Sequence, residues 1–311
     1  MNGIIIIDKP AGKTSHDVVL DIKKILGVKK VGHTGTLDPL ATGVLPVCIN
    51  EGTKLAQFFS LDKKEYRATM LLGVKTDTYD VEGKIIAEEK PGASPEDIKK
   101  ALYSLVGKRK QVPPPYSAVK YQGKPLYKWA RKGIAVPSLP RSIEIYQLSL
   151  EEVNLPYATF KVTCSKGTYI RSLCMEVGEM LGCGACLAAL RRIKSGCYSE
   201  KEAFSFTENG GKNNKDLLAA HLISLADALP EIPAIQIDGQ LAEKLRQGYQ
   251  PVFDNLNNYH IPFLAAGDVL KFTQNSRLVA IAKMLYAPDQ LPVLAGREQA
   301  VKILRVFNSE C

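Results

Sequence analysis

The sequence lacks any hydrophobic run close to the roughly 20 residues that a helix needs to span a bilayer. Near the N-terminus, only residues 4–7 form an apolar run. No basic segment precedes this run and no small-residue cleavage site follows it, so it does not predict a secretory leader. These absences argue against membrane-spanning classes and predict a cytoplasmic protein.

Disulfide and metal-binding patterns are also missing. The chain has seven cysteines, an odd number, and only Cys183 and Cys186 have CxxC spacing. A structural zinc site usually needs a second such pair, and the four histidines show no metal-ligand spacing. We therefore expect reduced, mostly buried cysteines and predict no metal or cofactor site.

Positive charge is in excess. The 311 residues include 41 Lys and Arg against 32 Asp and Glu, which gives a net charge of +9. Hydrophobic residues make up 45% and charged residues 23% of the chain, a balance typical of a folded protein of about two domains. The basic excess favours nucleic acid over an anionic membrane surface as a partner. Many basic proteins bind neither, however, so charge alone does not establish a partner.

Hydrophobic patterning predicts strands and helices in the first two thirds of the chain. Apolar or alternating runs predict strands at residues 3–7, 44–49, 63–72, 143–150 and 158–164. Capping residues and apolar positions at helical spacing predict helices at residues 15–26, 95–106 and 167–181.

The composition changes near Pro230 and Pro233. Beyond them the sequence predicts three short strands, at residues 269–273, 278–283 and 301–307. We therefore predict two domains, residues 1–230 and a small β-rich domain at 231–311. The polar segment 208–216 is predicted to be a loop or insertion.

A glycine-rich stretch, GHTGTLDPLATG at residues 32–43, surrounds the single carboxylate of Asp38. It is too rich in glycine for a helix interior and lacks the alternation of a strand. We predict a shaped loop, a kind of segment that often carries function. On its own, Asp38 before Pro39 could equally be a turn residue.

Aromatic and basic residues alternate in residues 111–133, QVPPPYSAVKYQGKPLYKWARKG. Three prolines predict an extended entry to this segment. Rings that stack on bases beside cations that meet phosphates would form a nucleic-acid platform. Inward-packed rings with merely solvated lysines fit the same pattern, and the local sequence does not choose between the two.

Two apparent motifs do not carry chemistry. Gly12-Lys13-Thr14 resembles the end of a phosphate-binding P-loop, but Ile7 occupies the position of the required first glycine. Ser15-His16-Asp17 contains the residue types of a hydrolytic triad, but neighbours on one helical turn cannot align as nucleophile, base and orienting group. We interpret them as a helix cap and first turn.

Several segments together resemble the TruB-type tRNA pseudouridine synthases. In the family's order, from Ile4 to about Arg192, the chain contains DKPAGKTSHDVV, GHTGTLDPLATG, KKEYRA, PPPYSAVKYQGKPLYKWAR, CSKGTYIRSL and GCGACLAALRR. The C-terminal region is more weakly similar to a small PUA-like RNA-binding domain. The resemblance implies an α+β protein: a pseudouridine synthase core with a mixed, mainly antiparallel central sheet flanked by helices, followed by the PUA-like domain.

The resemblance also implies an activity. Such enzymes isomerise uridine to pseudouridine at position 55 in the T-loop of tRNA, after the base is flipped out of its stack. The implied partner is the tRNA T-arm, with no cofactor, no metal, no membrane and no obligate protein partner.

Site residues follow from the motifs that match. Asp38 matches the family's essential aspartate, and Arg171 the arginine that pairs with it. Tyr66 matches the ring that stacks on the target uracil and can assist removal of its C5 proton. The remaining matches are Tyr169 and Leu190, which line the uridine pocket, and His33, which contacts the T-loop. Candidate phosphate contacts are Lys9, Lys120, Lys128, Arg131, Arg191 and Arg192.

A second hypothesis is an RNA-folding chaperone or assembly factor that uses the same surfaces without chemistry. The basic charge and the aromatic–lysine segment support it equally well. The distinguishing feature is Asp38 together with Arg171, which binding alone does not require.

Overall fold

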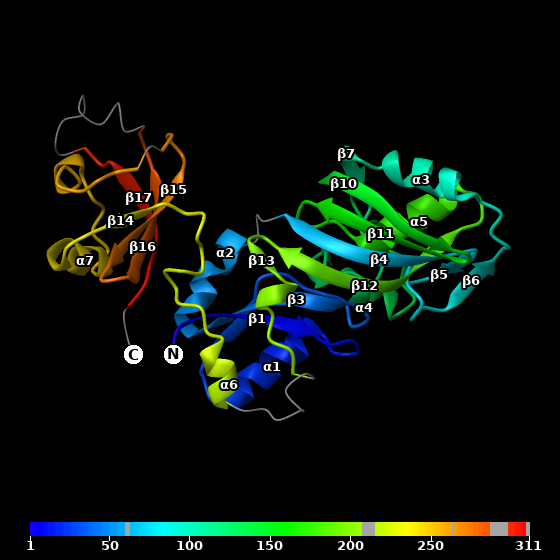
Figure 1. The fold of residues 1–311 in the computed structure, drawn as a ribbon, viewed down its shortest axis with the longest axis horizontal. Coiled ribbons are helices and arrows are strands. Elements are labelled where there is room, and N and C mark those ends of the chain that lie inside the picture. Colours follow the sequence, from blue (N-terminus) through cyan, green and yellow to red (C-terminus); the bar gives the residue numbers. More distant parts are fainter. Residues whose placement is uncertain (60–62, 207–214, 263, 287–297, 309–311) are drawn as a thin grey trace.

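The structure, a computed structural model, describes the whole chain except residues 60–62, 207–214, 263, 287–297 and 309–311 (Figure 1). Its larger part is built on a nine-stranded mixed sheet with the strand order β1-β3-β12-β4-β11-β10-β7, to which β2 and β13 add at β3 and β12. In chain order the strands are β1 (Gly3–Lys9), β2 (Val31–His33), β3 (Thr42–Ile49), β4 (Lys64–Leu72), β7 (Gly107–Gln111), β10 (Arg141–Asn154), β11 (Tyr157–Cys164), β12 (Ala185–Ser195) and β13 (Tyr198–Ser199).

Pairing in this sheet is mostly antiparallel. Strand β12 runs parallel to β3, and the other described pairs of the sheet are antiparallel. The mixed, mainly antiparallel sheet implied by the family resemblance is therefore confirmed. Alternation explains strand β4, where residues 64, 66, 68, 70 and 72 are buried while the intervening residues are at least partly exposed.

All three predicted helices are present, but the helix predicted at 95–106 ends at Tyr103 and the one predicted at 167–181 spans Ile170–Met180. Helix α1 (Ser15–Leu26) has a capping box formed by Thr14 and Asp17 and ends at Gly27, which has a φ of +65°. Helix α3 (Pro95–Tyr103) contacts β10, while α5 (Ile170–Met180) contacts both β4 and β12. Apolar side chains of all three helices join those of the strands in one core. No described helix is both long and apolar enough to cross a membrane.

Strand β12 is the main element that the sequence analysis missed. Its sequence ACLAALRRIKS lacks regular alternation, and its pairing with β4 has two register shifts. It is paired along both edges because it lies between β3 and β4. Each register shift inserts an extra residue, which breaks the regular alternation that would mark the strand in the sequence.

Smaller elements surround the main sheet. Strands β5 (Val74–Thr76) and β6 (Ile85–Glu88) form a hairpin. The aromatic–lysine segment contains β8 (Lys120–Tyr121), β9 (Lys124–Pro125) and α4 (Leu126–Ala130). After β3 come the 3-10 helix η1 (Asn50–Leu55) and α2 (Ala56–Phe59), and α6 (Lys215–Ala220) lies near α1.

A second sheet is formed by the C-terminal part of the chain. Its order is β14-β15-β16-β17, with bounds Ala234–Gln236, Val269–Gln274, Arg277–Met284 and Val301–Val306. Helix α7 (Gly239–Arg246) packs on β15 and β16. The three predicted strands are confirmed, and Asn275 and Ser276, both with positive φ, form the turn between β15 and β16. The boundary at residue 230 stays a prediction, and most of segment 208–216 lies outside the described residues.

Gly43 provides a test of how β3 packs against β12. Its φ is +100°, and a Cβ at this position would lie 2.2 Å from the Arg192 carbonyl oxygen. We expect Gly43→Ala to destabilise the fold by more than the about 1–3 kcal/mol of backbone strain alone. Gly248→Ala is the matched control, because Gly248 has a φ of +90° but open space around it. Urea unfolding of both variants measures the difference, and equal losses would show that contact with Arg192 is not limiting.

Candidate active site

The loop that carries Asp38 connects β2 to β3 and is held by Ser15 and Gly12. The Ser15 hydroxyl accepts a hydrogen bond from the Leu37 amide at 2.8 Å and lies 3.2 Å from the Leu37 carbonyl oxygen. The Gly12 amide donates to the Pro39 carbonyl at 2.9 Å. The predicted shaped loop is therefore confirmed, and Ser15 acts as its anchor as well as the first residue of α1.

Arg171, in the first turn of α5, faces Asp38. Its Nε lies 2.9 Å from Oδ2 of Asp38, and its second terminal nitrogen donates to Oδ1 at 3.1 Å. The Oδ1 contact is a hydrogen bond, whereas the Nε contact is a close ion pair without hydrogen-bond geometry, and together they hold the carboxylate against the guanidinium. Only 4% of the Arg171 side chain is exposed, whereas 34% of the Asp38 side chain is accessible. The carboxylate is therefore supported from behind and open on its other side.

The rest of the Arg171 guanidinium is also occupied. It donates to the carbonyls of Thr78 and Tyr116, each at 3.0 Å, and lies 3.5 Å from Asp80 Oδ2. One buried side chain thus joins the Asp38 loop, the turn before β6 and the entry to the aromatic–lysine segment.

Asp80 is a site residue that the sequence analysis missed. It is 5% exposed and accepts hydrogen bonds from the Thr78 hydroxyl at 2.6 Å and the Glu82 amide at 3.1 Å. The preceding residue, Tyr79, has a φ of +65°, which is uncommon for a bulky residue. The segment KTDTYD after a predicted strand was the available signal, but charged turn residues are usually exposed.

The two carboxylates affect each other. Burial raises the pKa of Asp38 above its usual value of 3.8, the Arg171 charge opposes this rise, and Asp80 adds to it. Arg171 therefore favours the ionised form of Asp38 and opposes the effect of burial.

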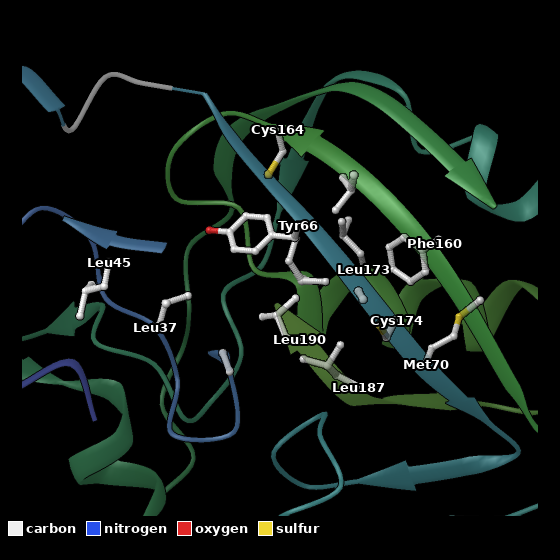
Figure 2. Close-up of a cluster of buried hydrophobic side chains, with 14 of the residues drawn as sticks. Leu37, Leu45, Tyr66, Met70, Phe160, Cys164, Leu173, Cys174, Leu187 and Leu190 are labelled. Carbon is white, nitrogen blue, oxygen red and sulfur yellow. The ribbon is translucent and has the colours of Figure 1, made fainter. Parts of the chain in front are cut away.

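Apolar and aromatic residues lie beside the ion pair. Tyr66 on β4 and Leu190 on β12 are nearly buried residues of the main core, and Leu190 is the register partner of Ala68, two positions from Tyr66. Figure 2 shows Tyr66 at the edge of this cluster, with its hydroxyl oxygen directed away from Phe160. Burial raises the pKa of Tyr66, so its hydroxyl stays protonated near neutral pH.

Tyr169 precedes α5 and is held through its backbone. Gln111, a buried residue that the sequence analysis missed, accepts from the Tyr169 amide at 2.8 Å and donates to its carbonyl at 3.1 Å. The pKa of Tyr169 is raised chiefly by burial, with a smaller contribution from the Asp38 charge. This arrangement fixes the start of the helix that carries Arg171.

His33 ends strand β2, immediately before the Asp38 loop. Burial and the neighbouring Arg192 charge lower its pKa, so the imidazole is neutral near pH 7. Its Nδ1 and the Thr34 hydroxyl are buried and have no hydrogen-bond partner in the structure.

Two of the six residues predicted to contact phosphate, Lys9 and Arg192, are buried, and their predicted role is corrected here. Lys9 is 0% exposed and donates to the carbonyls of Pro10, Lys13 and Pro39, and burial lowers its pKa to about 8. Arg192 is 1% exposed and donates to the Val44 carbonyl at 2.7 Å and to the Gly35 carbonyl at 3.2 Å. Both side chains brace the Asp38 loop through its backbone and present no charge to solvent.

The side chain of Arg191 is not buried, but carboxylates neutralise its charge. It makes two contacts of 2.9 Å with the Asp8 carboxylate and one of 2.9 Å with Glu200. These two carboxylates neutralise its charge locally and raise its pKa. The remaining candidates, Lys120, Lys128 and Arg131, are exposed.

The aromatic–lysine segment shows features of both sequence interpretations. Its lysines face solvent, while Tyr121 and Trp129 pack edge to face with centroids 6.4 Å apart. Arg131 lies over the Tyr127 ring at 5.3 Å. The half-buried rings order the segment, and the exposed cations remain available to an anion. No group of three or more potential metal ligands occurs among the described residues.

Comparison with known proteins identifies the family. Residues 23–170 match the model of the TruB family pseudouridylate synthase N-terminal domain, and residues 171–223 match that of the tRNA pseudouridylate synthase B C-terminal domain. The chain is 52% identical over 309 residues to tRNA pseudouridine synthase B of Syntrophus aciditrophicus, covering 99% of both chains. The chain belongs to the TruB family.

More distant members and solved structures agree with this assignment. This TruB-family chain is 39% identical to tRNA pseudouridine synthase B of Thermosipho melanesiensis, with 99% of each chain covered. A crystal structure of a Cbf5-Nop10-Gar1 complex matches 98% of this chain and 85% of the other, with a TM-score of 0.73 and 27% identity. A structure of an H/ACA RNP bound to a substrate RNA containing 2'-deoxyuridine covers the same shares, with a TM-score of 0.71 and 25% identity. The predicted family and fold are confirmed, and the chain is an enzyme of the pseudouridine synthase class.

Proposed function

We propose that this enzyme converts uridine to pseudouridine at position 55 in the T-loop of tRNA. The observation that carries the proposal is the accessible Asp38 carboxylate held from behind by the buried Arg171 guanidinium. The relatives named tRNA pseudouridine synthase B support tRNA as the substrate.

The reaction is an isomerisation within one nucleotide. The bond from C1′ of the ribose to N1 of uracil breaks, the base turns, and a bond forms from C1′ to C5. The proton on C5 is lost and N1 gains one, so the atoms balance without a co-reactant. Cleavage of a glycosidic bond builds positive charge on the sugar, which an adjacent carboxylate stabilises or attacks.

Asp38 is the proposed catalytic carboxylate. Attack on the sugar, attack on the base and removal of a sugar proton each require its ionised form. Arg171 supplies the charge that keeps it ionised, and Asp80 with the Thr78 carbonyl positions Arg171. Water must be kept out, because it would trap the free sugar cation and release the base.

The target base must leave its stack to reach Asp38. We assign Tyr66 and Leu190 to the two faces of the flipped uracil, with Tyr169 lining the pocket next to the ion pair. Flipped bases are commonly held between aromatic and apolar side chains. The neutral imidazole of His33, at the start of the Asp38 loop, is suited to contact the bases that remain in the T-loop.

Exposed cations of the aromatic–lysine segment are the proposed phosphate contacts. We expect the double variant Lys128→Gln, Arg131→Gln to lower the slope of log affinity against log salt by about 1–2, because each lost phosphate contact contributes about 0.7–0.9. Fluorescence anisotropy with labelled tRNA from 50 to 300 mM KCl measures it. The control is Lys99→Gln with Lys100→Gln, two exposed cations on α3, and equal slopes in both double variants would contradict the assignment.

Tritium release tests the function directly. Transcripts of tRNA labelled with [5-³H]uridine should lose one tritium per molecule in the presence of enzyme. A transcript with cytidine at position 55 should lose none, because no other uridine occupies the site. Release from the substituted transcript would contradict T-loop specificity, and release from neither would contradict tRNA as the substrate.

A further inference from the structure

Arg192 is a buried arginine at a point where three strands of the main sheet meet. On β12 it is the register partner of Tyr66 in β4 and of Gly43 in β3. Residues directly opposite each other on antiparallel strands point to the same face, with Cβ atoms about 4.5–5.5 Å apart. The side chains of Arg192 and Tyr66, which are 1% and 8% exposed, therefore lie side by side on the buried face of the sheet.

The guanidinium of Arg192 also reaches the loop between β2 and β3. Its Nε donates to the Val44 carbonyl at 2.7 Å, and a terminal nitrogen donates to the Gly35 carbonyl at 3.2 Å. Figure 2 shows the hydroxyl oxygen of Tyr66 directed towards the side of the cluster on which Leu37 of this loop lies. Arg192 thus links the loop to the strand that carries the Tyr66 ring.

The charge of Arg192 has no carboxylate partner in the part of the chain that the structure describes. Its neighbour Arg191 pairs with two carboxylates, and Arg171 pairs with those of Asp38 and Asp80. No described ion pair includes Arg192, although a buried charge without a counter-charge is costly to the fold. The protein therefore keeps an uncompensated positive charge beside the proposed site.

This charge acts on two rings of the proposed site. Burial raises the pKa of Tyr66, whereas the Arg192 charge and a side-chain hydrogen bond with Arg192 oppose that rise. The same charge adds to the effect of burial in lowering the pKa of His33. Both effects are those of a positive potential around the rings, which favours a negative charge placed against them.

The proposed reaction has a step that such a potential stabilises. When the bond from C1′ to N1 breaks, its electron pair stays with the uracil, which is an anion until C5 bonds to C1′. The anion must be retained while the base turns, because a base that escapes cannot be reattached. A fixed positive charge directed at the place where negative charge develops lowers the barrier of this step.

We propose that Arg192 is a positioning residue that acts through Tyr66. It holds the Tyr66 ring and hydroxyl beside the Asp38 loop, and its charge stabilises the detached uracil that the ring covers. This proposal rests on the proposed function, because the place of Tyr66 against the uracil belongs to it. It explains why a buried arginine without a carboxylate partner lies opposite Tyr66.

A double-mutant cycle tests whether Arg192 acts through Tyr66. Arg192→Lys keeps the charge but cannot reach both loop carbonyls and the Tyr66 hydroxyl at once. We expect kcat for a T-arm stem-loop to fall about 10- to 100-fold, with KM within about threefold. In the Tyr66→Phe background the same change should cost at least about ten times less, because the hydroxyl that it acts through is absent.

The matched control is Arg67→Lys, at an exposed arginine that follows Tyr66 on β4. It should change kcat in neither background. Equal losses from Arg192→Lys in the two backgrounds would overturn the proposal, because a purely structural brace costs the same with or without the Tyr66 hydroxyl.

Hydrogen exchange of the Arg192 guanidinium gives a second readout, which needs neither activity nor a variant of Arg192. In protein labelled with [¹⁵N]arginine, the terminal N–H groups of Arg192 should exchange at least about ten times faster in Tyr66→Phe than in wild type. The Nε–H group, bonded to the Val44 carbonyl, is the internal reference and should keep its rate. Equal terminal rates in both proteins would overturn the proposal. If wild type converts no T-arm uridine, the proposed function fails instead, and the exchange rates still decide whether Arg192 holds Tyr66.

Discussion

Asp38→Asn should abolish pseudouridine formation while leaving tRNA binding intact. The amide has nearly the same shape as the carboxylate and can still lie beside Arg171, but it carries no charge to stabilise or attack the sugar. We expect tritium release to fall at least about a thousandfold, comparable to the loss of other essential charged groups. Single-turnover release with saturating enzyme measures the chemical step, and anisotropy measures binding.

The matched control is Asp254→Asn, at an exposed position of the C-terminal part. It removes the same charge from the chain and should keep wild-type release. Comparable binding by Asp38→Asn, Asp254→Asn and wild type would place the whole loss in catalysis. Release within tenfold of wild type by Asp38→Asn would contradict the catalytic assignment and return the RNA-folding hypothesis to first place.

Arg171→Lys should give the second largest effect, because it keeps the positive charge but loses the two contacts with Asp38. A lysine cannot reach Asp38, Asp80 and the carbonyls of Thr78 and Tyr116 at once. We expect a loss of about 10²- to 10³-fold in kcat, a range typical for removal of an oriented charged group.

The pH profile separates an electrostatic role of Arg171 from a purely structural one. Burial already raises the pKa of Asp38, and Arg171 opposes that rise. A weaker cation contact lets the pKa rise further, so the ionised carboxylate is lost at a higher pH as the solution is acidified. The acidic limb of kcat/KM should therefore move to higher pH in Arg171→Lys. An unchanged limb with reduced thermal stability would indicate structural support alone.

Local sequence signals determined much of the fold. Thr14 and Gly27 mark the ends of α1 by side-chain capping and by a left-handed backbone, both of which depend on residues a few positions apart. Alternation in β4 likewise depends on near neighbours and was predicted within one residue. Strand β12 was missed because two register shifts in its pairing with β4, a property of the assembled sheet, break its alternation.

The residues at the proposed site also fall into two groups, those that the sequence predicted and those that it could not. The sequence singled out Asp38, Arg171, Tyr66, Tyr169 and Leu190 because long motifs resemble those of one family. It could not distinguish the exposed cations, such as Lys128, from the buried ones that brace the Asp38 loop. A lysine or arginine looks the same in the sequence whether it is exposed or buried. Only the folded structure shows that backbone carbonyls already accept hydrogen bonds from a buried charge.

The sequence by itself determined the family, the shape of the Asp38 loop and most of the local elements. Only the tertiary structure decided which carboxylate joins Asp38 at Arg171, which cations are buried, and how the C-terminal sheet is attached. The physical reason is that these features join residues far apart in the chain, as Asp80 does with Arg171 and Lys54 with Val306. Such contacts depend on burial and geometry, which no local pattern records.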